Sequence, residues 1–85
     1  MVQKSLVVAV DPGIQADVAA KFVHEANRYT SEIFLEKNGR RINAKSIMGI
    51  LSLAIAKGED ITLFIDGEDE REAIDSLTTF LTKTE

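Results

Sequence analysis

Apolar and polar residues alternate along several short segments of the chain, a pattern that predicts β-strands. Residues 5–10, SLVVAV, are rich in β-branched side chains, and residues 60–66, DITLFID, form a second segment of this kind. The alternating apolar positions on one face of these two segments are Leu6, Val8, Val10, Ile61, Leu63 and Ile65. Two more strands, residues 33–37 and 40–44, flank an Asn-Gly pair that is typical of a two-residue type I′ hairpin turn.

Three other segments place apolar residues at helical spacing. The first follows an Asp-Pro-Gly turn, and its apolar positions are Ala16, Ala19, Ala20, Phe22, Val23 and Ala26. The second begins at Ser46, a residue type favoured at helix N-caps, and Gly49 favours a short helix there. The third begins at Asp69, which has the spacing of a capping box with Glu72. The apolar stripe of this third helix is Ala73, Ile74, Leu77, Phe80 and Leu81.

The order of these elements is β-α-β-β-α-β-α, which predicts the α+β fold class. Because two of the strands form a hairpin, the economical arrangement is an open-faced β-sandwich, a four-stranded antiparallel sheet with helices packed on one face. The chain has 85 residues without a repeat or a linker, so we expect a single domain over residues 1–85.

Composition and charge narrow the function classes. The net charge of -4 argues against nonspecific binding to nucleic acid or to an anionic membrane. With no cysteine and one histidine, neither a metal site nor thiolate chemistry is expected, and no cofactor is implied. The apolar run near the N-terminus is too short for a signal peptide or a membrane span, so we expect a cytoplasmic protein.

Few side chains offer catalytic chemistry. Gln15 stands where the first turn enters a helix, yet an amide neither acts as a nucleophile nor takes a proton near neutral pH. Asp17 nearby would repel a phosphate, so these two positions favour a helix start without catalysis. His24, the only imidazole, falls on the polar face of the same helix, where a solvated side chain is expected.

The sequence allows two interpretations of Ser46. As a helix N-cap it has a purely structural role. As a phosphorylation site it would place a dianion beside the free amides of a helical turn, next to the apolar Ile47 and Met48. Four basic residues around the hairpin, Lys37, Arg40, Arg41 and Lys45, are compatible with an acidic partner or with a solvated turn.

The segments NAKSIMGILSLA, KGEDITL and GEDEREAI, within a resemblance over almost the whole chain, are similar to those of the histidine-containing phosphocarrier (HPr) family of the bacterial sugar phosphotransferase system. The resemblance implies the open-faced fold above. Phosphocarriers of this family have a G-[IL]-H-A-R-P-A segment whose histidine receives phosphate from enzyme I. Here Gln15 replaces the histidine, Asp17 the arginine and Val18 the proline, so sugar phosphotransfer through this position is not expected.

Glutamine at that position marks the regulatory branch typified by Crh, the catabolite repression HPr-like protein. The resemblance implies a non-enzymatic protein that HPr kinase/phosphorylase phosphorylates on Ser46 and that then binds a LacI-type catabolite control repressor as corepressor. It further implies a partner-binding surface formed by Lys45, Ile47, Met48 and Leu51.

Alternatives remain open. Asp17 stands where the family has an arginine that contacts the repressor. The reversed charge replaces an attraction to acidic groups of the partner with a repulsion. The alternatives are a phosphocarrier component that uses His24 and a phosphate-independent protein-binding module. Neither a monomer nor a homodimer is favoured by the sequence.

Overall fold

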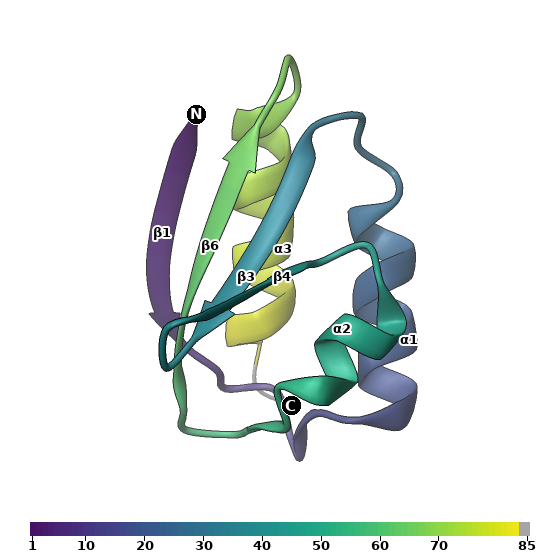
Figure 1. Ribbon diagram of the computed structural model, residues 1–85, viewed down its shortest axis with the longest axis vertical. Coiled ribbons are helices and arrows are strands. Elements are labelled where there is room, and N and C mark those ends of the chain that lie inside the picture. The colour runs from purple at the N-terminus through teal and green to yellow at the C-terminus, as the bar shows by residue number, and fades with distance from the viewer. Residues whose placement is uncertain (84–85) are drawn as a thin grey trace.

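A four-stranded antiparallel sheet with helices on one face forms the domain, as the computed structural model shows for residues 1–83 (Figure 1). The strand order in this sheet is β1-β6-β3-β4, and a separate two-stranded pair is formed by β2 and β5. The elements are β1 (Val2–Val7), β2 (Gly13–Ile14), α1 (Ala16–Ala26), β3 (Glu32–Lys37), β4 (Arg40–Asn43), α2 (Ile47–Ser52), β5 (Ile55–Ala56), β6 (Asp60–Asp66) and α3 (Glu70–Thr82). The predicted α+β open-faced sandwich is therefore confirmed, while the β2–β5 pair was not predicted.

The core lies between the helices and the covered face of the sheet. Ile61, Leu63 and Ile65 of β6 are buried, as their alternation predicted. In α1 the buried residues are Ala19, Phe22 and Ala26, whereas Ala16 and Ala20 are exposed, contrary to the prediction. The buried stripe of α1 advances three or four residues at a time, and Ala20 is turned about 100° away from Ala19.

The first strand begins and ends earlier than predicted. It covers Val2–Val7 rather than residues 5–10, and its register with β6 runs from Val2 opposite Ile65 to Val7 opposite Asp60. Beyond Val7 the chain continues to pair for one residue with the segment before β6: the N–H of Val8 donates to the carbonyl of Glu59, and its carbonyl accepts from the N–H of Gly58. Val8 is still fully buried, and the amide N–H groups of Ala9 and Val10 donate to the carbonyl of Leu81 at the end of α3.

The predicted hairpin is confirmed in its turn geometry. Asn38 and Gly39 both have positive φ angles, 51° and 81°, as a type I′ turn requires. The strands that they join are β3 and β4, with Lys37 opposite Arg40.

The predicted capping box at the start of α3 is wrong, because the carboxylate of Asp69 is used elsewhere. Asp69 makes no side-chain bond to its own helix. Instead it accepts hydrogen bonds from the backbone N–H groups of Thr30 (2.9 Å) and Ser31 (3.0 Å) and from the hydroxyl of the buried Ser31. Glu70, rather than Glu72, reaches back to the N–H of Gly67 (3.2 Å). Asp69 therefore ties the loop after α1 to the start of α3.

Three carboxylates with lowered pKa values determine how the stability of the fold changes with pH. The Ser31 hydroxyl, and then the Thr30 N–H, hold the pKa of Asp69 below its usual value. The Lys37 ammonium lowers the pKa of Glu59, and the N-terminal ammonium lowers the pKa of Glu70. Because the folded pKa values lie below the unfolded values of about 4, these carboxylates stabilise the fold above about pH 4. That stabilisation is lost as the pH falls through the folded pKa values.

We expect Asp69→Asn to unfold at lower urea concentration than the wild type at neutral pH. Thr30 and Ser31 donate to different oxygens of the carboxylate, and the amide NH₂ that replaces one of these oxygens cannot accept a hydrogen bond. The difference in urea midpoint should narrow as the pH falls below about 4, where Asp69 is protonated first in the unfolded chain and then, at lower pH, in the folded protein. Asp75→Asn, at an exposed position of α3, is the control and should show no such narrowing. A difference that stays constant down to about pH 3 would contradict the assignment.

Candidate functional site

Ser46 caps the second helix, as predicted. Its backbone is extended (φ -106°, ψ 116°), and its Oγ accepts a hydrogen bond from the N–H of Gly49 at 3.2 Å. The preceding turn is closed by Asn43, whose side-chain oxygen accepts from the N–H of Lys45 (2.8 Å) and whose carbonyl accepts from the N–H of Ser46 (3.1 Å). Ser46 is half-buried, so its hydroxyl lies at the edge of the protein surface in a fixed backbone geometry.

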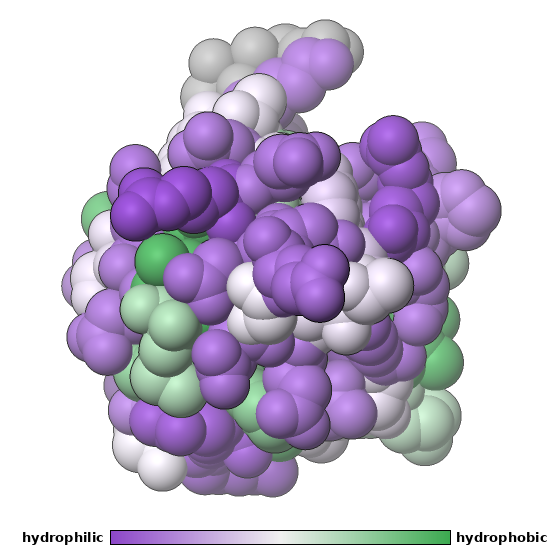
Figure 2. Space-filling model, turned by 90° about the horizontal axis from the view of Figure 1, so that it is seen from above, coloured by the Kyte–Doolittle hydropathy of each residue, from purple (hydrophilic) through white to green (hydrophobic). Residues whose placement is uncertain are grey.

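Three apolar side chains of α2 face solvent directly after Ser46. Ile47 is 39% exposed, Met48 74% and Leu51 39%, whereas Ile50 is fully buried and anchors the helix to the core. We call Ile47, Met48 and Leu51 the docking patch. Elsewhere apolar exposure is sparser: the end of the molecule in Figure 2 is mostly hydrophilic, with only small apolar areas. Exposed apolar side chains clustered on one short helix are typical of an interaction surface.

Lys45 has a contact that the sequence did not reveal. Its ammonium donates to the carbonyl of Tyr29 at 2.7 Å, at the end of the segment that follows α1. The side chain is half-buried, and a partner carboxylate would compete with that carbonyl for the ammonium. A role for Lys45 as a charge partner stays a prediction.

Gln15 and Asp17 lie at the start of α1, both exposed. Gln15 is the N-cap by position, but its side chain makes no capping bond, and only its carbonyl accepts from the N–H of Ala19 (2.8 Å). Asp17 is in the first turn, where its negative charge suits the helix dipole. His24 is exposed, as expected.

The short β2–β5 pair brings the start of α1 next to the chain that leaves α2. Gly13 lies opposite Ala56, and Ile14 lies opposite Ile55. Helices α1 and α2 also pack against each other (Figure 1). Gln15 and the docking patch therefore belong to neighbouring elements of the fold.

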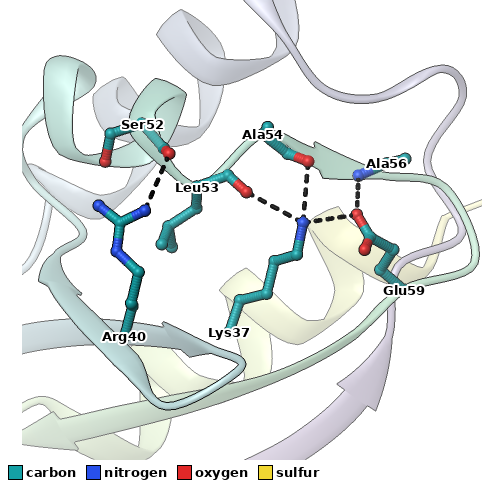
Figure 3. Close-up of polar contacts among 7 residues, drawn as sticks. All are labelled: Lys37, Arg40, Ser52, Leu53, Ala54, Ala56 and Glu59. Carbon is teal, nitrogen blue, oxygen red and sulfur yellow. Dashed lines mark hydrogen bonds and ion pairs between the residues drawn. The ribbon is translucent and has the colours of Figure 1, made fainter.

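Lys37 and Arg40 of the hairpin lie against the end of α2 (Figure 3). The Lys37 ammonium donates to the carbonyls of Leu53 and Ala54, each at 3.0 Å, and forms an ion pair with Glu59 at 2.9 Å. Arg40 reaches the carbonyl of Ser52 at 3.5 Å. The sequence indicates Lys37 and Arg40 only as basic residues near a turn, and it does not indicate their contacts with the end of α2. Arg41, on the opposite face of the sheet, forms an ion pair with Glu36 (3.3 Å) and lies over the ring of Phe64.

Other features of the described residues 1–83 add no second site of obvious chemistry. A cavity of about 290 Å³ between α1 and the end of α3 is lined by Val10, Asp11, Val18, Lys21, Phe80 and Lys83, and no residue of α2 lines it. No group of three acidic, histidine or cysteine side chains in this range could hold a metal ion. None of the helices in this range has the length and apolar character needed to cross a membrane.

The fold and the sequence together define the class of protein. The family model described as "PTS HPr component phosphorylation site" matches residues 2–83, so the chain belongs to the HPr family. Within this family the chain is Crh-like. It is 55% identical to the HPr-like protein Crh of Halalkalibacterium halodurans over 98% of the chain and 99% of that protein. It is 52% identical to the HPr-like protein Crh of Bacillus subtilis over 95% of each.

Solved structures confirm the fold. The phosphocarrier protein HPr from Bacillus anthracis superimposes with a TM-score of 0.92 at 50% identity, over 94% of the chain and 95% of that structure. The crystal structure of Bacillus subtilis Crh, described as a swapped, intertwined dimer, matches with a TM-score of 0.76 at 52% identity, over 95% and 93%. The resemblance inferred from the sequence is confirmed.

Proposed function

We propose that this chain is a non-enzymatic regulatory protein of carbon catabolite repression. In this proposal HPr kinase/phosphorylase phosphorylates Ser46, and the phosphorylated protein binds a LacI-type catabolite control repressor as its corepressor. The protein acts in the cytoplasm. It is not competent for sugar phosphotransfer, because Gln15 replaces the histidine that carries the phosphate in the phosphocarriers of the family.

The observation that carries the proposal is the exposed docking patch directly beside the hydroxyl of Ser46. Phosphorylation adds about -2 charge and three acceptor oxygens at this position. The change is local, and the buried side of α2, anchored by Ile50, is not disturbed. A partner that pairs basic groups with the phosphate and covers Met48 would therefore distinguish the two forms.

Phosphorylation of Ser46 is tested with purified HPr kinase/phosphorylase and ATP. We expect one phosphoryl group on the wild type and none on Ser46→Ala by intact-mass analysis. Ser52→Ala is a matched control on the same helix, where the hydroxyl donates to the carbonyl of Gly49, and it should be phosphorylated like the wild type. The phosphorylated wild type should bind the repressor at least about tenfold more tightly than Ser46→Ala, since charged hydrogen bonds contribute about 1.5–3 kcal/mol each.

Two outcomes would contradict this assignment: Ser46→Ala accepts phosphate as well as the wild type, or both forms of the wild type bind the repressor equally. Equal recovery of another protein by both forms would favour a phosphate-independent binding module.

The assembly state is part of the proposal. Crh of Bacillus subtilis is described as a dimer in a crystal structure, and a solid-state nuclear magnetic resonance structure also describes Crh as a dimer. We infer that this chain is a monomer or a homodimer, which light scattering after size-exclusion chromatography would decide.

A further inference from the structure

The side chain of Lys37, in the hairpin, holds the end of α2. Lys37 extends from the last position of β3, and its ammonium contacts three oxygens: the carbonyls of Leu53 and Ala54 and the carboxylate of Glu59 (Figure 3). The Lys37 side chain is only 13% exposed, so water has little access to the ammonium. All three donor positions of the ammonium are thereby used, and charge-assisted bonds of this kind are stronger than neutral ones.

Helix α2 needs such an external partner. It has six residues, Ile47–Ser52. The carbonyls that Lys37 contacts belong to its C-cap residue Leu53 and to the next residue, Ala54, at the point where a helix end leaves carbonyls without a partner within the helix. The chain then turns through Ala54, a non-glycine residue with φ of 49°, which L-residues adopt at a cost. Since helices this short are unstable in isolation, the contacts at its two ends determine how firmly it holds its orientation.

The same ammonium also reaches the start of α1 indirectly. Glu59, its ion-pair partner, accepts a second hydrogen bond from the N–H of Ala56 at 2.7 Å. Ala56 belongs to β5, which pairs with β2 immediately before Gln15. Lys37 thus fixes the end of α2 relative to the segment that carries the start of α1.

We propose that Lys37 is a positioning residue for partner binding, which holds the docking patch in the orientation that the partner of the Ser46-phosphorylated protein recognises. The ammonium of Lys37 bonds to the carbonyls of Leu53 and Ala54 and to Glu59 rather than to Ser46 or the docking patch, so it acts through the backbone at the end of α2. This inference rests on the proposed function. A loose α2 would still expose Met48 and still carry a phosphate, but it would have to be ordered on binding, which lowers affinity.

The decisive variant is Lys37→Met, which keeps the length and apolar stem of the side chain and removes the donor. We expect the amides of Leu53, Ala54 and Ala56 to exchange hydrogen at least about tenfold faster in the folded variant, because local opening becomes easier. After phosphorylation of Ser46, its affinity for the LacI-type repressor should fall about tenfold or more. Lys37→Arg, which retains several donors, should recover most of both properties.

Arg41→Met is the matched control. Arg41 is a basic residue of the same hairpin, but it lies on the open face of the sheet against Glu36 and Phe64. The Arg41→Met substitution removes the same charge as Lys37→Met but on the other face of the sheet. It should therefore change neither the hydrogen exchange of the α2 amides nor the affinity for the repressor. If Lys37→Met does not fold, Glu59→Gln keeps an acceptor oxygen for both donors, removes the charge, and should show a smaller change in the same direction.

The outcomes separate the inference from the proposed function. A folded Lys37→Met protein that binds with unchanged affinity overturns the inference, and so does an equal loss in Arg41→Met. Unchanged amide exchange in Lys37→Met overturns it without any reference to the repressor. If the phosphorylated wild type fails to bind the repressor, the proposed function fails, while the exchange data still report whether Lys37 holds α2.

Discussion

Gly13→Ala is expected to destabilise the fold by about 3 kcal/mol or more, which corresponds to a fall of roughly 12–24 °C in the unfolding temperature of a domain this size. Gly13 has a φ of +121°. A Cβ on it would lie 2.7 Å from the carbonyl oxygen of Ile55, 2.8 Å from the Cα of Ala56 and 2.8 Å from the amide nitrogen of Lys57. All three are backbone atoms, so relief requires separation of β2 from β5. Thermal unfolding followed by circular dichroism measures the loss.

Gly58→Ala is the control for backbone strain alone. Gly58 also has a positive φ, +93°, but nothing lies within 4 Å of the position that its Cβ would take. The Gly58→Ala substitution should lower the free energy of unfolding only by the cost of a left-handed backbone conformation, about 1–2 kcal/mol. If Gly13→Ala is no worse than Gly58→Ala, the close approach of β2 and β5 does not constrain the fold.

The close approach at Gly13 illustrates what sequence patterns do not reveal. The sequence indicates Gly13 only as the end of a turn, because nothing local distinguishes a glycine that packs against a distant backbone from one that turns the chain. Strands β2 and β5 have two residues each, too few for an alternation pattern to be recognised. The pair that joins the two halves of the candidate site therefore became visible only in three dimensions.

Charged side chains with distant partners show the same limit. Asp69 has the spacing of a helix cap, yet its carboxylate bonds to Thr30 and Ser31, 39 and 38 positions away. Lys37 bonds to Leu53 and Ala54, 16 and 17 positions away. Local rules describe which bonds such a side chain is able to make, but not which of several acceptors the fold brings near.

Features set by neighbouring residues were predicted well. The positive φ angles of the Asn38-Gly39 turn follow from the residue types alone. The N-cap bond of Ser46 spans three residues, and the alternation of β6 needs only its own sequence. The 74% exposure of Met48 did not follow from its sequence neighbours, and its role in partner binding stays a prediction.

The start of α1 allows a test of why the chain would not carry phosphate. The amide of Gln15 has no basic lone pair for a phosphoryl group, and the exposed Asp17 adds a negative charge within the first turn of the same helix. A phosphorylated donor protein would meet repulsion there as well as an inert side chain.

We expect no transfer of phosphate from phosphoenolpyruvate and enzyme I to the wild type, and acid-labile labelling of the triple variant Gln15→His, Asp17→Arg, Val18→Pro. Gln15→His alone should be labelled at least about tenfold more slowly than the triple variant. Replacing the attraction of an arginine by the repulsion of Asp17 should raise the activation free energy by about 1.4 kcal/mol or more, which corresponds to a tenfold lower rate. Incorporation of radiolabelled phosphate over time, with and without acid treatment, measures each rate.

His24 is exposed in this chain, so the experiment must exclude it as the phosphate acceptor. Introducing His24→Gln into the triple variant should leave its labelling unchanged, since His24 lies more than two helical turns from position 15 and the donor would have to approach a different part of α1. Acid-labile label on the wild type that disappears with His24→Gln would make the chain a phosphocarrier through His24, and the regulatory assignment would then need a second, independent role for Ser46.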